Sequence, residues 1–325
     1  MSATTRKAKQ FLVVIIKLLI VGGAFYFIYD RIANNEQLDW VRFTDALQQK
    51  HSFWIVFLIL LLTFLNRFLE ILKWQNLVSY IQPLTLGKAT EQVLAAVTAA
   101  LFTPNGIGEY AAKAMYYSKK QSKTILMLNL VCNGIQPIYT VVFGLFGLFF
   151  FNFLYNAIPA KVLFLIFAIV FTLLFVFFSA RKMTIKGYSL HKLFQKINEV
   201  PKSIHRKNIL LASGRYLSMI HQHYLLFLAF DVALPYPIMI SVIACVYFLG
   251  SSLPSFQFLD FAVRGSVAVY FFGILGVNEW IVVFAATLQW LLNIVIPVTI
   301  GSYFVFRFKS ARTDSDEDIT ISHPE

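Results

Sequence analysis

Six segments of the chain are apolar over about the 20 residues that a helix needs to cross a lipid bilayer. They are Phe11–Tyr29, Phe53–Lys73, Ile125–Phe151, Val162–Phe178, Ile209–Phe230 and Trp280–Phe306. Because backbone polar groups find no water inside a bilayer, segments of this kind must satisfy those groups internally, as helices do. The sequence therefore predicts an all-α, polytopic membrane protein of about six full spans.

Composition supports a membrane protein and argues against a nucleic-acid partner. The 325 residues are 58% hydrophobic and only 14% charged, whereas a soluble chain of this length needs more polar surface. The 28 Lys and Arg residues outnumber 16 Asp and Glu residues, but the basic residues gather between the apolar segments, which is typical of cytoplasmic loops. We therefore expect no nucleic acid among the partners.

Two further apolar regions are interrupted in the middle. Lys88–Tyr117 is broken at Pro104, and Pro237–Phe272 is broken by the glycine and proline of the run 250–254. Each half of these regions is short for a full span. Each region therefore predicts a re-entrant helix hairpin. The alternative is that each region forms two thin spans, which would give eight or more segments in all.

The distribution of Lys and Arg predicts that both termini are cytoplasmic. The loop 181–207 holds eight basic residues against one acid, and it is expected to attract anionic lipid headgroups at about 1 kcal/mol per charge. No small-residue cleavage site follows the first apolar segment, so it is interpreted as a retained helix. The sequence predicts a single membrane domain over 1–310 and an acidic, disordered cytoplasmic tail over 311–325.

The halves 52–151 and 209–306 carry the same polar pattern in the same order. Amides and a proline stand four residues apart in each half: Asn129, Asn133 and Pro137, then Gln289, Asn293 and Pro297. Upstream, Arg67 and Arg215 each lie within an apolar segment. Since the expected orientation runs the two halves in opposite directions, the pattern predicts an inverted repeat with a site near the midplane.

Each broken region also carries an acid and a base one helical turn apart. Glu109 and Lys113 follow the first break, and Asp260 and Arg264 follow the second. Residues four apart on a helix can pair, and ionisable groups at membrane depth are costly enough to be functional candidates. An anchoring role at the water interface is the alternative for both pairs. Lys73 is expected to extend its amine to the membrane surface.

The breaks themselves predict part of a binding site. Gly106 and Gly108 permit positive φ and close backbone approach, and N–H groups at a helix start favour an anion such as a phosphate headgroup. The residues expected to bind substrate are Arg67, Pro104, Gly106, Gly108, Glu109, Lys113, Asn129, Asn133, Arg215, Pro254, Asp260, Arg264 and Asn293. For the amides, simple adhesion between helices is an equal alternative.

Motifs for other chemistry are absent from the sequence. It contains no Walker loop, no dinucleotide-binding glycine fingerprint, no His-Glu-x-x-His and no nucleophile elbow. We therefore expect no cofactor, no metal and no enzymatic activity. Cys132 and Cys245 lie within apolar segments and are expected to be core residues.

Arg67 followed by Trp74, together with the run Thr103-Pro104-Asn105-Gly106-Ile107-Gly108-Glu109-Tyr110, resembles the lysylphosphatidylglycerol synthase transmembrane-region family of flippase-like membrane proteins. The resemblance extends over roughly residues 10–308. It implies lipid handling in the bacterial cytoplasmic (inner) membrane, because the corresponding half of the bacterial enzyme is credited with lipid translocation. It also implies a membrane phospholipid or related polar lipid as partner, and a separate lipid-synthesising enzyme.

This sequence departs from the family pattern at the candidate site. The family often has Arg where this chain has Gly106, and often has paired acids where it has Asn129 and Asn133, which argues against a lysyl-lipid substrate. We expect translocation of a polar lipid between leaflets. A membrane-embedded transferase with Glu109 or His221 as base, and a scaffold that docks through the basic loop, are the alternatives.

Overall fold

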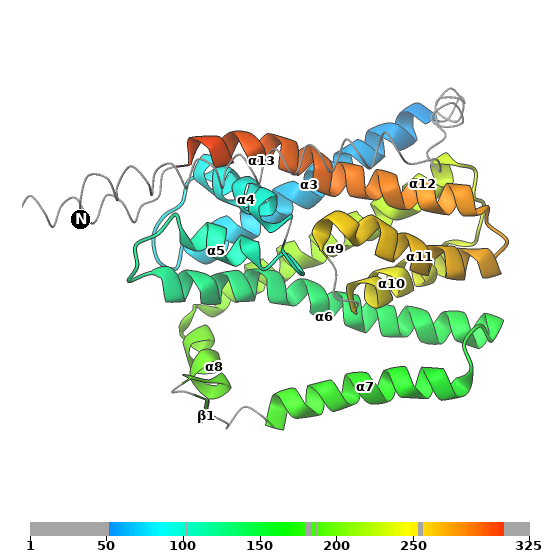
Figure 1. Ribbon diagram of the computed structural model, residues 1–325, viewed down its shortest axis with the longest axis horizontal. Coiled ribbons are helices and arrows are strands. Elements are labelled where there is room, and N and C mark those ends of the chain that lie inside the picture. The colour runs from blue at the N-terminus through cyan, green and yellow to red at the C-terminus, as the bar shows by residue number, and fades with distance from the viewer. Residues whose placement is uncertain (1–51, 102, 180–183, 186–187, 253–255, 309–325) are drawn as a thin grey trace, which may run out of the picture.

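The computed structural model describes residues 52–101, 103–179, 184–185, 188–252 and 256–308 as a bundle of helices (Figure 1). The predicted segment 11–29, the acidic tail 311–325 and Pro254 lie outside these residues. The helices are α3 Ser52–Val78, α4 Leu86–Ala100, α5 Gly108–Ala114, α6 Ser122–Tyr155, α7 Ala160–Ser179, α8 Leu190–Glu199, α9 Lys202–Ala229, α10 Tyr236–Ser252, η2 Gln257–Leu259, α11 Asp260–Ile274, α12 Glu279–Trp290, η3 Leu291–Val295 and α13 Ile296–Arg307. Two very short strands, β1 Thr184–Ile185 and β2 Tyr188–Ser189, pair ahead of α8.

The protein is a helical membrane protein, as the sequence predicts. Three helical stretches are long and apolar enough to cross a bilayer, namely Phe53–Val78, Ser122–Tyr155 and Glu279–Arg307. Shorter apolar helices cover Ala160–Val176 and Tyr236–Ser252. The predicted span Ile209–Phe230 falls within α9, which is less apolar because it buries several polar side chains against its neighbours.

Both predicted interruptions separate two helices. In the first, Pro104 and Asn105 form a tight turn in which the Gly106 N–H donates to the Thr103 carbonyl (3.1 Å). Asn105 has φ 49° and Gly106 has φ 69°. A positive φ at the third residue of a turn, directly after a proline, is the pattern of a type II turn, and Asn105 occupies that place. The two breaks meet, since Pro104 and Phe256 form an antiparallel backbone bridge.

Glycines allow the helices of the two halves to pack closely. A side chain at Gly144 on α6 would overlap Phe248 of α10, and one at Gly301 on α13 would overlap the Leu94 carbonyl of α4. Small residues at such contacts bring helix backbones together within a membrane. α6 therefore packs against α10, α4 against α13, and α3 against α9.

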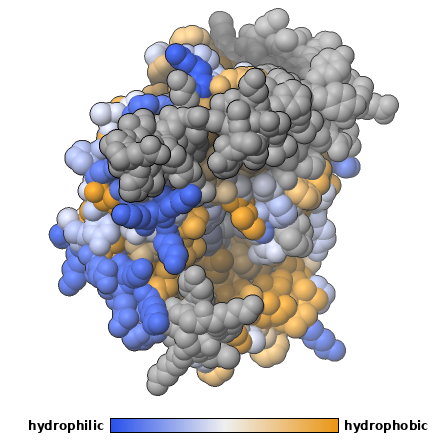
Figure 2. Space-filling model, turned by 60° about the vertical axis from the view of Figure 1, so that its left-hand side comes forward, coloured by the Kyte–Doolittle hydropathy of each residue, from blue (hydrophilic) through white to orange (hydrophobic). Residues whose placement is uncertain are grey.

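The outer surface divides into apolar and polar regions. Phenylalanines of α7 are largely exposed, with Phe164 76% and Phe175 72% accessible, as expected of side chains that contact lipid. Hydrophilic residues gather at the end of the molecule that carries α8 and the α5–α6 connection (Figures 1 and 2). Lys119, Lys120 and Lys123 are exposed in that connection and at the start of α6.

The last helical stretch contains a π-helical turn. Proline at 297 has no N–H, so the carbonyl of Asn293 loses its usual helical donor. Residues Leu291–Val295 widen into η3 immediately before this proline. π-turns inside α-helices are frequent at functional sites, and this one faces the cavity described next.

Candidate functional site: a polar cavity among the helices

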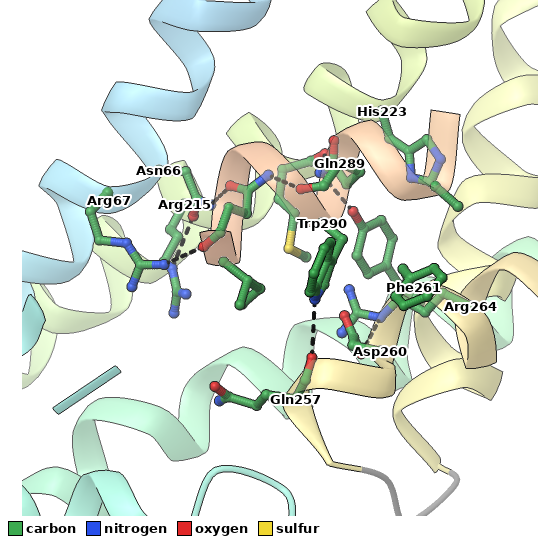
Figure 3. Close-up of a pocket in the computed structure, with 15 residues that line it drawn as sticks. Asn66, Arg67, Arg215, His223, Gln257, Asp260, Phe261, Arg264, Gln289 and Trp290 are labelled. Atoms are coloured by element: carbon green, nitrogen blue, oxygen red, sulfur yellow. Dashed lines mark hydrogen bonds and ion pairs between the residues drawn. The ribbon is translucent and has the colours of Figure 1, made fainter. Parts of the chain in front are cut away.

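A cavity of about 210 Å³ lies among α3, α9, α10, α11, α12 and η3 (Figure 3). Its lining combines charged, amide and aromatic side chains: Asn66, Arg67, Arg215, Met219, His223, Tyr247, Gln257, Asp260, Phe261, Arg264, Ala286, Gln289, Trp290, Asn293 and Ile294. Such a polar lining within an apolar bundle is expensive unless it serves a ligand or a pathway.

Two arginines at one side of the cavity share one carboxylate. Glu70 on α3 is 3% exposed, and its Oε2 lies 2.5 Å from Arg67 Nη1 and 3.3 Å from Arg215 Nη2. Arg67 comes from α3 and Arg215 from α9, so the ion pairs join the first helices of the two halves. One buried carboxylate thus holds two guanidinium groups at the cavity wall.

The Asn293 carbonyl, which Pro297 leaves without its usual helical donor, is one of the groups that orient Arg67. Arg67 Nη2 donates to the Asn293 carbonyl (2.7 Å), and this is the acceptor that has no helical donor because residue 297 is a proline. Arg67 therefore replaces the missing backbone donor. The hydrogen bond explains why the Asn-x-x-x-Pro spacing and the arginine occur together at this site.

A chain of amides continues from the arginines across the cavity wall. Arg215 Nε donates to Asn66 Oδ1 (3.0 Å), and Asn66 Nδ2 donates to Asn293 Oδ1 (2.6 Å). Asn293 Nδ2 donates to Gln222 Oε1 (2.9 Å), and Gln289 Nε2 approaches the same oxygen at 3.2 Å. These amide side chains are uncharged, and their continuous hydrogen bonding fixes the side chains around the two arginines.

The opposite side of the cavity carries a neutral ion pair. Arg264 Nε lies 2.9 Å from Asp260 Oδ1, and the Arg264 guanidinium sits 4.6 Å from the ring centre of Tyr247. Figure 3 shows this pair on the far side of the Trp290 indole from Arg67 and Arg215. Trp290 Nε1 donates to the Gln257 carbonyl (3.3 Å) and so ties the second break to the cavity.

Several buried polar atoms at the cavity make no hydrogen bond within the described part of the chain. They are Arg67 Nε, both ring nitrogens of His223, Gln257 Oε1 and Gln289 Oε1. His223 is 2% exposed and stacks on Phe227 with ring centres 5.3 Å apart. Unsatisfied buried polar groups are rare in native proteins and call for a partner such as a ligand or water.

A second polar cluster contains the predicted pair of the first break. Lys113 Nζ lies 2.5 Å from Glu109 Oε1 and 2.9 Å from Asn129 Oδ1, and Asn133 Nδ2 donates to the same Glu109 oxygen (3.1 Å). The amine also lies 4.4 Å from the ring centre of Trp74. The predicted pairing of Glu109 with Lys113 is confirmed, and both amides join it. None of these four polar residues lines the cavity.

The N–H groups predicted to be free at the first break are bonded. Gly106 N–H donates to the Thr103 carbonyl, and Gly108 N–H donates to Thr103 Oγ1 (2.9 Å). The expected phosphate site at these glycines is therefore wrong in this structure. Gly108 serves close packing instead, because a Cβ there would lie 2.7 Å from the Ala99 carbonyl.

Two basic residues near the expected membrane surface are also more buried than predicted. Lys73 is fully buried, and its Nζ has no hydrogen-bond partner among the described residues, so the expectation that it reaches the surface is wrong. Arg215, which lies within an apolar segment, turns inward to Glu70. Side chains of α9 and α6 cover this end of α3 and exclude the expected route to water.

The structure brings Arg67, Arg215, Asp260, Arg264 and Asn293 together at the cavity, and it places Pro104 beside the second break. Gln289, part of the amide pattern noted in the sequence, also lines the cavity. Sequence reasoning did not select the remaining participants: Asn66, Glu70, Gln222, His223, Tyr247, Gln257 and Trp290. For Asn66 the available signal was a polar side chain inside an otherwise apolar helix.

No group of three metal-binding His, Cys, Asp or Glu side chains occurs among the described residues. His221 bonds the Tyr236 hydroxyl (2.8 Å), away from the cavity lining. The residues at the cavity are therefore suited to binding a polar group by ion pairs and hydrogen bonds.

Comparison with known proteins identifies the family. No curated protein matches the chain. The family model described as "Lysylphosphatidylglycerol synthase TM region" matches residues 14–301, a range that includes every helix that lines the cavity. This match confirms the resemblance seen in the sequence. The chain belongs to the lysylphosphatidylglycerol synthase transmembrane-region family.

Proposed function

We propose that this protein moves the polar headgroup of a phospholipid or related lipid across the membrane, from one leaflet to the other. The observation that carries the proposal is the cavity lined by three arginines, Asp260 and a row of amides inside an apolar helical bundle. A headgroup must lose its water to cross hydrocarbon, and fixed charges and hydrogen bonds in such a cavity offset that cost. Membership of a lipid-linked family supports the same function.

The packing of the helices supports an inverted repeat. The first helices, α3 and α9, pack against each other, while the first helix of each broken region packs against the last helix of the other half: α4 with α13, and α10 with α6. Halves related by a two-fold axis in the membrane plane produce this exchange of partners. The bridge between Pro104 and Phe256 then lies where the halves meet, suited to closing the headgroup path from one side.

The proposed setting is the bacterial cytoplasmic membrane, with both termini and the basic loop 181–207 in the cytoplasm. The start of α6, near which the exposed lysines lie, is at the same end of the molecule as α8 (Figure 1), and this supports the proposed orientation. A separate enzyme would make the lipid. A transferase with Glu109 as base is less well supported, because Lys113 and Asn133 occupy the same Glu109 oxygen.

Leaflet exchange of fluorescent phospholipids in proteoliposomes tests the proposal. The native protein should accelerate exchange, and Asp260→Asn should slow it strongly, because Arg264 then lacks its carboxylate at the cavity. Glu109→Gln should also slow exchange by loosening the first break. The control is Glu279→Gln, which alters an exposed acid outside the cavity.

Two results would count against the proposal in different ways. Native-like exchange in both Asp260→Asn and Glu109→Gln would overturn the assignment of residues. If the native protein accelerates exchange of no anionic, zwitterionic or aminoacylated lipid, translocation itself is overturned, and a transferase or a scaffold becomes the better account.

A further inference from the structure

The charges around the cavity do not balance. At one side, Asp260 and Arg264 compensate each other (2.9 Å). At the other side, Glu70 faces both Arg67 and Arg215, so two guanidinium groups share a single carboxylate. Arginine keeps its charge at any physiological pH. Among the described residues, one positive charge therefore remains uncompensated at the Arg67 and Arg215 side.

The surrounding residues do not remove this surplus. Within the described part of the chain, the groups that bond the two arginines beyond Glu70 are the Asn66 side chain and the Asn293 carbonyl, both neutral. Glu109, the acid of the second polar cluster, is held by Lys113. Lys73, one turn along α3 from Glu70, is itself basic and has no acid bonded to it within the described residues, so it cannot offset the surplus.

Buried polar atoms at the cavity are available to a ligand. Arg67 Nε has no partner within the described residues, and neither does either ring nitrogen of His223, which is 2% exposed. A phosphate oxygen is an acceptor that arginine binds well, often with two parallel hydrogen bonds. A lysyl or ethanolamine ammonium would instead meet a wall with excess positive charge.

The size of the cavity suits a headgroup rather than a whole lipid. Its volume of about 210 Å³ lies below the roughly 300–1,000 Å³ of pockets that enclose drug-sized ligands. Acyl chains would therefore remain outside, among the apolar helix surfaces. A phosphodiester headgroup with a small neutral substituent satisfies both the volume and the charge.

We propose that the cavity selects a lipid with an anionic phosphodiester headgroup and no compensating cation, bound through Arg67 and Arg215. This inference rests on the proposed function for its lipid, while the charge argument rests on the cavity alone. The inference separates this chain from carriers of cationic lysyl-lipids. The asparagines at 129 and 133 agree with it, because they stand where the family often has paired acids.

Competition binding by the purified full-length protein in detergent tests the inference. The probe is phosphatidylglycerol with a fluorescent acyl chain, displaced by unlabelled phosphatidylglycerol, phosphatidylethanolamine, lysyl-phosphatidylglycerol or inorganic phosphate. Phosphatidylglycerol should displace the probe at about tenfold lower concentration than either lipid that carries an ammonium, since complementary charge mainly confers discrimination between ligands. Equal displacement by all three lipids would overturn the inference.

A pair of variants distinguishes surplus charge from simple damage. Arg215→Gln leaves Glu70 paired with Arg67 alone, so the surplus charge and the tenfold preference should both disappear. Glu70→Gln/Arg215→Gln leaves Arg67 unpaired, restores the surplus and should restore the preference. Lys120→Gln, the same charge change at an exposed residue, should keep it. Loss of the preference in the double variant as well as in Arg215→Gln would contradict the charge argument.

The remaining outcomes separate this inference from the proposed function. Selective binding of phosphatidylglycerol without leaflet exchange would support the inference and overturn translocation. Exchange of all lipids at one rate, with no preference in binding, would support translocation and overturn the inference. Displacement by inorganic phosphate at concentrations as low as those of the lipid would identify a soluble anion as the ligand and would overturn the lipid assignment.

Discussion

Replacing Glu70 by glutamine should destabilise the protein more than any other single isosteric change at the site. The carboxylate is 3% exposed and holds Arg67 and Arg215, whose side chains are 14% and 18% exposed. Breaking a buried ion pair typically costs about 3–5 kcal/mol, because the remaining charge stays buried without a partner. Since both arginine side chains are partly accessible at the cavity, we expect a loss near the lower end, about 3 kcal/mol.

The compensating variant makes this prediction specific. Glu70→Gln/Arg215→Gln leaves one unpaired guanidinium group in place of two, so it should recover about half of the loss, roughly 1.5 kcal/mol. Glu91→Gln is the matched control, because Glu91 pairs with Lys88 at the surface (2.9 Å, the lysine side chain 66% exposed). An exposed ion pair of this kind is worth at most about 1 kcal/mol.

The measurement is the free energy of unfolding in mixed detergent micelles titrated with a denaturing detergent, followed by tryptophan fluorescence. A loss below about 1 kcal/mol for Glu70→Gln would refute the claim that this carboxylate joins the two halves. A double variant no more stable than Glu70→Gln would show that charge compensation is not the cause.

Three further predictions concern the packing on which the cavity depends. Gly144→Ala should lower the unfolding free energy by about 1–3 kcal/mol, since its Cβ would overlap Phe248. Gly134→Ala is the control, because Gly134 has open space around it, and this change should be neutral or stabilising. Equal effects of the two variants in the same detergent titration would contradict the close approach of α6 to α10. Gln92→Leu should lower the unfolding free energy by about 1–3 kcal/mol, because Gln92 Oε1 accepts buried hydrogen bonds from Trp74 (2.7 Å) and Tyr117 (2.8 Å). A native-like unfolding midpoint would show that these bonds do not form. Cys132 and Cys245 are buried and should resist a maleimide polymer reagent until the protein is denatured, when a gel should show two additions per chain; labelling of the folded protein would place a cysteine at the surface.

The sequence predicts the helical architecture well because its signal is local. Apolar length identifies α3, α6 and the last helical stretch, and the prolines and glycines identify both interruptions. The pair Glu109 and Lys113 is also local, since helical spacing alone brings the two side chains within reach. These features need no knowledge of which helix lies beside which.

The composition of the cavity could not be predicted in the same way, because it depends on long-range packing. Asn66 bonds Arg215 and Asn293, which lie 149 and 227 residues further along the chain. Glu70 lies one turn from Arg67 on α3, yet it also binds an arginine of α9. A residue's partner across an interface is not encoded in its own segment.

The errors at the first break have a physical reason as well. Sequence reasoning treated the glycines at 106 and 108 as anion donors because a helix starts there, but the Thr103 carbonyl and hydroxyl accept both N–H groups. Thr103 stands just before the proline, where a side-chain acceptor can close such a turn. The surface position expected of Lys73 failed because neighbouring helices cover it.

The most direct test of a headgroup path through this cavity is to block it with a single cysteine. Met219→Cys places a thiol at the lining, and Phe164→Cys places one on the exposed face of α7; the native cysteines are buried and should not interfere. Leaflet exchange in proteoliposomes is measured before and after treatment with a charged methanethiosulfonate. We predict that exchange by Met219→Cys falls to the protein-free rate, while Phe164→Cys and the native protein are unaffected. Undiminished exchange by fully modified Met219→Cys would contradict transport through the cavity.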